Sequence, residues 1–255
     1  MIHVLPDTEE IVTAGTRLVG AVLRGRARQT NAGLSFALSG GATPRKLYER
    51  LAGDAGERIP WPRISIFWGD ERCVPPEDLR SNYRMVARTG LLARPLAGIH
   101  RMPGELAPEE GAEKYAHELG TIFPQRHLPR FDLVLLGLGG DGHVASLFRG
   151  APGLTDREHW VVPTETYEGT RRLTLTLPVL ASARSLVFLV TGEAKAEAVR
   201  QVLSKEKEVG DRSLPARLLL EMVSMRERAG WECPTISWVL DRAAASLLPR
   251  HRVRH

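Results

Sequence analysis

The chain has 255 residues, of which 43% are hydrophobic and 25% charged, ordinary values for a globular protein. Its net charge of +5 comes from scattered arginines and one short basic run at residues 251–255, so we expect a solvated basic surface and no nucleic-acid partner. No apolar run is long enough to cross a membrane, and residues 1–10 resemble neither a signal nor a transit peptide, so we expect a cytoplasmic protein without membrane contact.

Strand and helix patterns alternate along the chain, which predicts a mainly parallel α/β sandwich in a single domain, residues 1–255. Asp7 and Glu10 form a pair typical of a helix start, and apolar residues between positions 11 and 23 follow at helical spacing. Another helix is predicted at residues 108–122, and Ser81 or Asn82 is expected to begin a third. The predicted strands are residues 2–5, 34–38, 64–68, 131–136, 160–162, 172–177, 185–190 and 235–240.

Other segments are assigned from local composition. Residues 95–108 are expected to be irregular, and the charged residues 205–211 are expected to form a loop. Residues 172–177 alternate leucine with threonine, which suits a half-exposed or edge strand. Residues 241–248 predict a closing helix.

A glycine-rich turn follows the predicted strand at residues 34–38. It reads Ser39-Gly40-Gly41-Ala42-Thr43-Pro44, with Thr43 expected as the N-cap and Pro44 as the first helical residue. The backbone N–H groups of such a turn and the N-terminus of the next helix both favour a phosphate. A plain strand-to-helix turn has the same composition, and the lysine that ends a Walker loop is missing.

Charged residues follow two other predicted strands. Asp70, Glu71 and Arg72 come after residues 64–68 and suit either a structural ion cluster or a functional site. A Thr-Gly pair ends residues 185–190, and Lys195 follows in the first turn of a predicted helix. Because the carboxyl ends of parallel strands lie at one edge of a sheet, we expect these groups and the glycine turn to lie close together.

Residues 131–148, FDLVLLGLGGDGHVASLF, indicate the catalytic centre. An apolar strand breaks into a glycine-rich turn that holds Asp141 and His143. Glycine lets a substrate approach the backbone, and histidine is a natural general base near neutral pH. The turn also matches the GxGxxG spacing of dinucleotide sites, but it lies mid-chain, would place Asp141 beside the pyrophosphate and lacks the later acid that contacts ribose. The combination with anion-binding turns predicts a phosphorylated small-molecule substrate.

Several segments, taken in order, resemble the 6-phosphogluconolactonase family, which shares a superfamily with glucosamine-6-phosphate deaminase. They are SGGATPRKLYERL, WGDERCVPPEDLRSNY, GLGGDGHVASLF, RRLTLTLPVL, LVTGEAKA and SWVLDRAAA, and they span nearly the whole chain. The resemblance implies a three-layer α/β sandwich with a Rossmann-like sheet and no required cofactor or metal. It also implies hydrolysis of 6-phospho-D-glucono-1,5-lactone to 6-phosphogluconate, a step of the oxidative pentose phosphate pathway.

The same resemblance implies roles for individual residues. His143 is the base that activates water, and Asp141 is its neighbour in the GDGH motif. The positions that correspond to contacts with the phosphate or the ring are Gly40, Gly41, Thr43, Asp70, Arg72, Arg172 and Lys195.

The deaminase branch is the main alternative, because it resembles the chain at the glycine turn, the Asp-Glu pair and the DGH motif. Deaminases usually have tyrosine where Arg72 stands, and after the histidine they have a stretch ending in Asn-Glu-Pro whose Glu supports that histidine. Here Val-Ala-Ser-Leu-Phe follows His143, so the ring-opening relay lacks a member and the lactonase is favoured. A sugar-phosphate-binding regulator without catalysis is a third alternative, against which the intact Asp141 and His143 argue. We expect a monomer or weak homodimer.

For the lactonase reaction, we expect neutral His143 to accept a proton from the water that attacks C1 and to return it to the ring oxygen. The oxyanion at C1 needs donors, either backbone N–H groups of a glycine turn or an arginine. The phosphate is far from the bond that breaks, so its binding supplies positioning. Whether Asp141 orients a neighbour or holds the turn stays open at this point.

Overall fold

The computed structural model describes residues 1–124, 127–204, 211 and 213–249. In this part of the chain, a seven-stranded sheet forms the middle layer, and its neighbouring strands pair in parallel. Its strands are, in spatial order, β1 (Ile2–Leu5), β10 (Thr235–Asp241), β9 (Ser185–Val190), β6 (Leu133–Leu136), β2 (Leu34–Leu38), β3 (Ile64–Trp68) and β5 (Gly98–His100).

Along the chain, strands are added from the middle of this sheet toward both of its edges. β2, β3 and β5 proceed toward one edge, whereas β6, β9 and β10 proceed toward the other, with β1 paired beyond β10. β2 and β6 are neighbours, so the connections that follow them leave in opposite directions. In open α/β sheets, such a reversal of strand order opens a crevice at the carboxyl ends of the strands.

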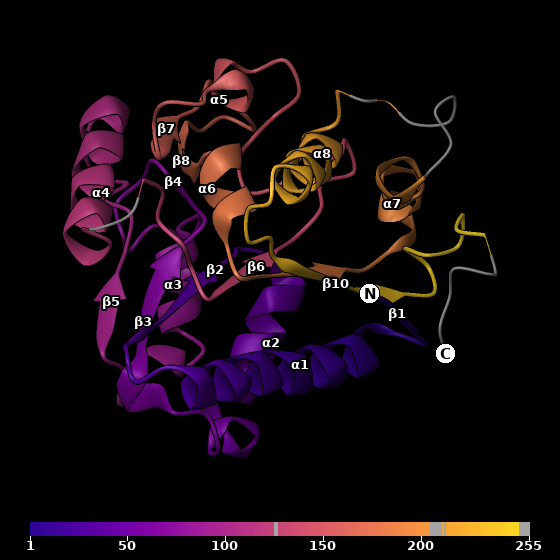
Figure 1. Cartoon of the computed structure of the whole chain (residues 1–255), viewed down its shortest axis with the longest axis horizontal. Coiled ribbons are helices and arrows are strands. Elements are labelled where there is room, and N and C mark those ends of the chain that lie inside the picture. The colour runs from indigo at the N-terminus through magenta and orange to yellow at the C-terminus, as the bar shows by residue number, and fades with distance from the viewer. Residues whose placement is uncertain (125–126, 205–210, 212, 250–255) are drawn as a thin grey trace.

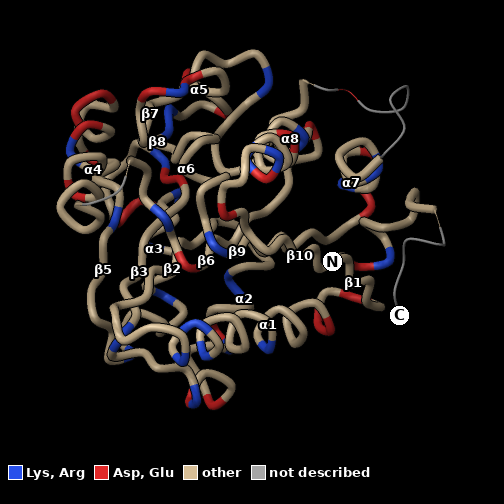
Figure 2. The backbone as a smooth tube through the Cα atoms, viewed as in Figure 1, with Lys and Arg blue, Asp and Glu red and all other residues tan. Residues whose placement is uncertain are grey.

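Helices cover both faces of the sheet, which confirms the three-layer sandwich. Figure 1 shows α1 (Thr8–Gln29) and α2 (Ala42–Ala52) on one face and α6 (Leu177–Ser182), α7 (Ala196–Leu203) and α8 (Pro215–Arg228) on the other. The remaining helices are α3 (Asn82–Ala87), α4 (Pro108–Ile122) and α5 (Pro152–Thr155), with short 3-10 turns at Asp54–Gly56, Trp61–Arg63, Leu91–Ala93 and Glu193–Lys195. Figure 2 shows charges of both signs along α1 and α4.

The central strands are apolar because both of their faces are covered. All residues of β2 and β6 are buried, as expected for strands between two helical layers. The rings of Phe188 on β9 and Trp238 on β10 stack with centroids 3.9 Å apart. None of the described helices has the length and apolar composition needed to cross a membrane.

A small antiparallel sheet stands beside the main one and packs against α4 (Figure 1). Its strands are, in order, β4 (Asp70–Arg72), β8 (Arg172–Leu175) and β7 (Val161–Pro163). β8 is the middle strand and is wholly buried, so the expected edge strand at residues 172–177 is wrong. The Thr174 hydroxyl donates to the carbonyl of Leu175 and accepts from the N–H of Ser146, and a threonine satisfied in this way tolerates burial.

Three further expectations differ from the structure. α2 begins at Ala42 with Gly41 as its N-cap, so Thr43 lies within the first turn instead of capping the helix. Residues 242–247 form turns instead of the predicted closing helix, because after one helical bond, from Ala245 N–H to the Asp241 carbonyl, the backbone continues with tighter bonds between residues three apart. The sequence predicts irregular structure over residues 95–108, but β5 lies there because its three residues pair in parallel with β3.

Some helix starts agree with the sequence and others were not predicted. Asp7 caps α1 by accepting from the N–H groups of Glu9 and Glu10, and Ser81 caps α3. The sequence analysis does not predict α8. The loop expected at residues 205–211 falls, except for its last residue, outside the described part of the chain.

Tyr48 on α2 holds the turn that follows β2. Its hydroxyl accepts from the N–H of Ser39 and donates to the carbonyl of the same residue, both at 2.9 Å. The ring is fully buried, and this burial raises the pKa of Tyr48, so the phenol stays protonated and able to donate.

We predict that Tyr48→Phe lowers the free energy of unfolding by about 1–3 kcal/mol, because it leaves both backbone groups of Ser39 buried without a partner. Urea unfolding measures the change. Tyr83→Phe is the matched control, since it removes a hydroxyl from a half-buried ring that packs at a tilt against Trp68. A loss for Tyr48→Phe no larger than that for Tyr83→Phe would contradict the prediction.

Candidate active site

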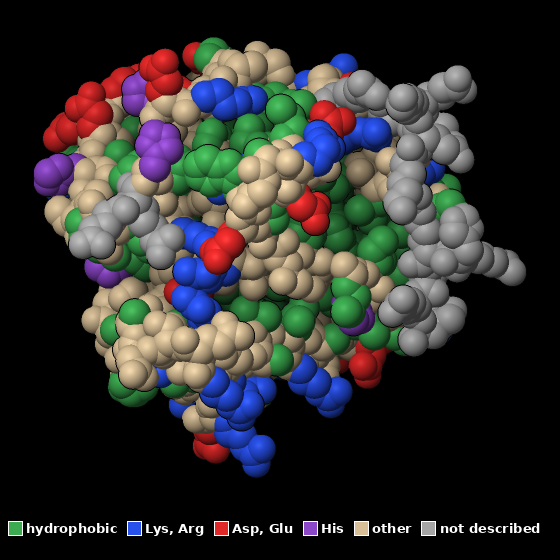
Figure 3. Space-filling model, viewed as in Figure 1, with side chains coloured by type: hydrophobic (Ala, Val, Ile, Leu, Met, Phe, Trp, Pro, Cys, Tyr) green, Lys and Arg blue, Asp and Glu red, His purple; other side chains and the backbone are tan. Residues whose placement is uncertain are grey.

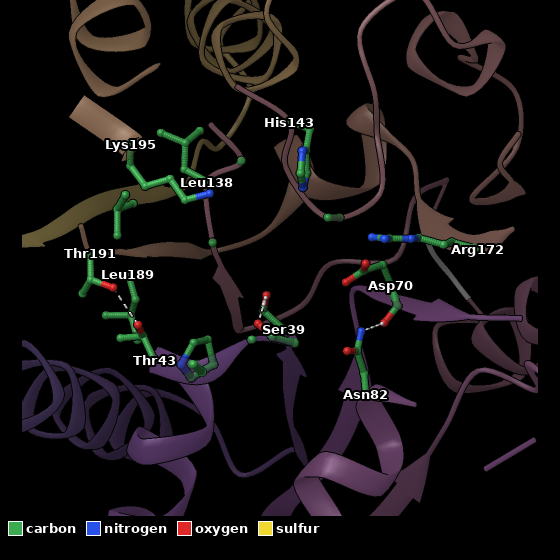
Figure 4. Close-up of a pocket in the computed structure, with 18 of the residues that line it drawn as sticks. Ser39, Thr43, Asp70, Asn82, Leu138, His143, Arg172, Leu189, Thr191 and Lys195 are labelled. Atoms are coloured by element: carbon green, nitrogen blue, oxygen red, sulfur yellow. Dashed lines mark hydrogen bonds between the residues drawn. The ribbon is translucent and has the colours of Figure 1, made fainter. Parts of the chain in front are cut away.

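A cavity of about 310 Å³ opens at the carboxyl ends of β2, β3, β6 and β9, where the strand order reverses. Figure 4 shows the side chains that line it. The predicted site residues in this lining are Gly40, Gly41, Thr43, Asp70, Arg72, His143, Arg172 and Lys195. Asp141 does not line the cavity and contacts His143 instead.

The glycine turn after β6 folds back on itself and presents His143 to the cavity. The N–H of Gly139 donates to the carbonyl of His143, and the N–H of Gly142 donates to the carbonyl of Gly139. A Cβ atom at Gly139 would lie 2.1 Å from His143 Nδ1, so only glycine leaves room for the imidazole. Gly142 has φ +79°, which other residues rarely adopt.

Asp141 fixes the protonation pattern of the imidazole. His143 Nδ1 lies 2.6 Å from Asp141 Oδ1, and the backbone N–H of His143 donates to the same oxygen. Burial raises the pKa of Asp141, but the charge of protonated His143 and these hydrogen bonds outweigh it, so the pKa lies below its usual range. An ionised carboxylate only accepts hydrogen bonds. Nδ1 is therefore the protonated nitrogen, and Nε2 keeps the lone pair that a base requires.

One end of the cavity favours an anion. Gly41, Thr43 and Lys195 line this end, and the first turn of α2 leaves its backbone N–H groups without partners in the helix. Thr43 Oγ1 lies 2.8 Å from Thr191 Oγ1, which joins the turns after β2 and β9. Figure 4 shows Lys195 pointing inward from the second of these turns.

The opposite end holds one acid and two arginines. Asp70 Oδ2 accepts a hydrogen bond of 2.6 Å from Ser146 Oγ, and Figure 4 shows the Arg172 guanidinium directed toward Asp70. The Nε atoms of Arg72 and Arg172 are buried and make no hydrogen bond within the described part of the chain. Arg172 Nη2 is paired with Glu168 at 3.1 Å.

The Asp-Glu pair has two separate roles in the structure. Glu71 faces away from the cavity and accepts from the N–H groups of Arg72, Asn82 and Tyr83, each at 2.7 Å. Burial raises the pKa of Glu71 against the opposing effect of these hydrogen bonds. The structural interpretation therefore holds for Glu71, while Asp70 and Arg72 line the cavity.

Sequence reasoning missed other lining residues. Asn82, considered only as a helix cap, donates to the carbonyl of Asp70, and its Oδ1 lies where a Cβ atom at Gly40 would stand. Ala145 also lines the cavity and has φ 49°. Alanine rarely adopts a positive φ, so its residue type gave no sign of this conformation. The pairing of Ser146 with Asp70 joins residues 76 positions apart and has no local signal.

A second, larger groove of about 820 Å³ lies between α4 and the segment from α5 to β7. Figure 3 shows acidic and histidine side chains gathered over these elements. The groove contains a surface pair in which His159 Nδ1 lies 2.8 Å from Asp156 Oδ2, and it contains none of the predicted site residues. Within the described residues, no group of three or more His, Cys, Asp or Glu is placed to hold a metal ion.

The parallel sheet, its two glycine turns and the His–Asp pair at the reversal point define an α/β enzyme with a site for a small anionic molecule. Residues 6–227 match the family model described as glucosamine-6-phosphate isomerases/6-phosphogluconolactonase, and the chain belongs to this family.

Individual relatives agree with this assignment. A 6-phosphogluconolactonase from Synechocystis sp. is 44% identical over 191 residues, which cover 72% of this chain and 77% of the relative. The human 6-phosphogluconolactonase is 35% identical over 97% of this chain and 93% of its own length. The solved structure of 6-phosphogluconolactonase from Trypanosoma brucei superimposes with a TM-score of 0.79 at 27% identity, covering 98% of both chains.

We predict that Asp141→Asn lowers kcat by about 100-fold with little change in KM, because it loosens the imidazole and no longer enforces the Nδ1–H tautomer. Steady-state kinetics measure both constants. Asp156→Asn is the matched control, since it alters the same kind of His–Asp contact outside the cavity. Equal effects of the two substitutions would contradict the role of Asp141.

The lowered pKa of Asp141 also predicts a pH dependence of stability. A carboxyl whose pKa is lower in the folded state contributes stability above its unfolded pKa of about 3.9, and this stability is lost as the pH falls through the folded value. The difference in unfolding free energy between wild type and Asp141→Asn should therefore be full at pH 6 and shrink below pH 4. If this difference in unfolding free energy grew toward low pH, the pKa of Asp141 would be raised by folding instead of lowered, and the prediction would be wrong.

Proposed function

We propose that this chain hydrolyses 6-phospho-D-glucono-1,5-lactone to 6-phospho-D-gluconate, the second step of the oxidative pentose phosphate pathway. The observation that carries the proposal is the placement of His143. Its Nδ1 is held by Asp141, and the ring lines a cavity with an anion-binding end and an arginine-lined end. Family membership and the near-full-length similarity to 6-phosphogluconolactonases support the same reaction.

The reaction needs a base for water and a donor to the departing ring oxygen. His143 Nε2 accepts a proton from water as the oxygen of that water attacks C1. The C1–ring-oxygen bond then breaks, and the imidazolium returns the proton to the ring oxygen. General base catalysis of this kind contributes about 10²–10⁴-fold to the rate.

The position of the phosphate determines how we place the substrate in the cavity. The phosphate fits the end formed by Gly40, Gly41, Thr43 and Lys195, where backbone N–H groups and an ammonium meet it. At the other end, Asp70 accepts hydrogen bonds from sugar hydroxyls.

At that other end, the guanidinium groups of Arg72 and Arg172 line the cavity and are the donors for the ring and for the oxyanion at C1. The phosphate then supplies positioning for chemistry at His143.

The surroundings of His143 favour the lactonase over the deaminase. Asp141 is the carboxylate paired with the imidazole, and the other ring neighbours recorded among the described residues are Phe148 and Tyr167. Among the residues that the structure describes, no second carboxylate is paired with His143, as a ring-opening relay would require.

We propose that the active unit is one domain, residues 1–255, in the cytoplasm, as a monomer or weak homodimer. The pairing of β1 with β10 supports a single domain, because it joins both ends of the chain in one sheet. Cys73 and Cys233 are free thiols, which fits a reducing compartment. Light scattering across a range of concentrations tests the oligomeric state.

We predict that wild type accelerates acid release from fresh 6-phosphogluconolactone above the spontaneous background, whereas His143→Ala and His143→Asn lose most turnover. Isothermal calorimetry with the product should show that both variants still bind it. His159→Ala is the control, because it removes an exposed histidine outside the cavity. Normal turnover in His143→Ala would disprove its assignment as the base. If wild type shows no acceleration, the lactonase proposal fails and ammonia release from glucosamine 6-phosphate becomes the assay.

We predict that Lys195→Ala raises KM by about 10–100-fold, the equivalent of one charge-assisted hydrogen bond of about 1.5–3 kcal/mol. Arg72→Ala should raise KM as well. Lys46→Ala is the control, since Lys46 lies on α2 and is exposed. An unchanged KM in either test variant would exclude that residue from substrate binding.

A further inference from the structure

Two stacked aromatic rings lie against the site from outside the cavity. Phe148 comes from the loop after the glycine turn, and Tyr167 comes from the hairpin that joins β7 to β8. Their centroids are 3.9 Å apart with an interplanar angle of 14°. We call these two residues the aromatic pair. Neither lines the cavity, so any effect on the reaction acts through the residues that they touch.

The aromatic pair restrains the imidazole of His143. The ring of His143 meets Phe148 at 4.9 Å and 62° and Tyr167 at 5.7 Å and 68°, edge-to-face geometries that aromatic rings prefer. The hydrogen bond to Asp141, whose side chain is 44% exposed, holds a single ring atom and leaves the imidazole free to pivot about it. The edge contacts remove that freedom.

The same pair contacts the guanidinium of Arg172. Its Cζ lies 5.1 Å from the centroid of Tyr167 and 5.4 Å from that of Phe148. The Arg172 side chain is only 7% exposed, and cation–π contacts are stronger when desolvated. One pair of rings therefore contacts both a candidate base and a candidate substrate ligand.

The backbone of the hairpin fixes the position of Tyr167. Tyr167 and Thr170 exchange backbone hydrogen bonds at 3.1 and 3.2 Å across a two-residue turn. Both turn residues have positive φ, Glu168 at 50° and Gly169 at 74°, which is the signature of a tight type I′ hairpin. Glu168 pairs with Arg172, so adjacent hairpin residues hold the guanidinium by charge and by an aromatic face.

We propose that Tyr167 is a positioning residue: its ring, stacked on Phe148, sets the angle of the His143 imidazole and the place of the Arg172 guanidinium. The inference rests on the proposed lactonase function for its kinetic test. It assigns the effect to the aromatic face of Tyr167 and not to its hydroxyl, because the ring contacts His143, Phe148 and Arg172, whereas the hydroxyl makes no hydrogen bond to the described residues.

The test compares Tyr167→Phe, Tyr167→Leu and Tyr167→Ala by steady-state kinetics, with Thr166→Ala as the matched control. Thr166 is an exposed neighbour in the same hairpin. Tyr167→Phe should keep the wild-type kcat, whereas Tyr167→Ala should lower kcat by about 10–100-fold, the cost of a small misplacement of catalytic groups. KM should change less than kcat, because the phosphate end of the cavity is untouched. Tyr167→Leu keeps apolar bulk without an aromatic face and should resemble Tyr167→Ala.

A double-mutant cycle separates positioning from support of the fold. In the His143→Ala background, Tyr167→Ala should lower the residual activity by a smaller factor than in wild type, since no imidazole remains to be positioned and only the contact with Arg172 is lost. Losses that multiply, a wild-type kcat in Tyr167→Ala, or an equal loss in Tyr167→Phe would each overturn the proposal.

A spectroscopic measurement keeps the inference testable if the wild-type protein proves inactive on the lactone. The NMR shift of the His143 Cε1 proton in the free protein depends on the ring currents of the aromatic pair. Tyr167→Ala should move it, and Thr166→Ala should not. An unmoved signal would overturn the positioning role, whereas a moved signal with inactive wild type would reject only the proposed function.

Discussion

The reversal of strand order between β2 and β6 is the constraint on which the site depends. Because the chain proceeds outward from this point in both directions, the connections after the two strands diverge and leave an opening above the sheet. β6 lies between β9 and β2, so the turn that carries His143 is flanked by the two turns that supply the anion-binding end. Parallel pairing holds these three strands in register and fixes the relative positions of their ends.

Glycine-rich turns have little conformational preference of their own. In this protein, hydrogen bonds from buried polar side chains hold them in one conformation. Tyr48 binds both backbone groups of Ser39 at the end of β2. Asp241 accepts from the N–H of Gly192 at 2.9 and 3.1 Å and so holds the turn before Lys195. Each of these side chains is buried, where a lost partner leaves a desolvated group unsatisfied. The turns are therefore kept in place by groups that a substrate does not touch.

The sequence predicted the elements whose signal is local and missed those set by tertiary contacts. Buried apolar runs located β2, β3 and β9 to the residue, because strands in the middle of a parallel sheet need apolar side chains on both faces. β8 was misread because the alternation of leucine and threonine is the same whether the threonines meet water or a buried backbone group. Most of the predicted residues that line the cavity follow a strand, whereas Arg172 opens one and was predicted only through the family resemblance. The aromatic pair was not, since Phe148 and Tyr167 meet only through the folding of the hairpin beside the main sheet.

The arrangement also explains why a phosphate that takes no part in bond breaking can serve the chemistry. β6 lies between β9 and β2 in the sheet, so the turn that carries His143 follows the middle one of three neighbouring strands. The turns after these outer strands meet through Thr43 and Thr191. In the proposed binding mode, a phosphate beside this contact has its sugar extended past the end of β6, toward His143 and the two arginines. Binding of the phosphate then aligns C1 of the lactone with His143, because hydrogen-bonded strands fix the distance between the two ends of the cavity.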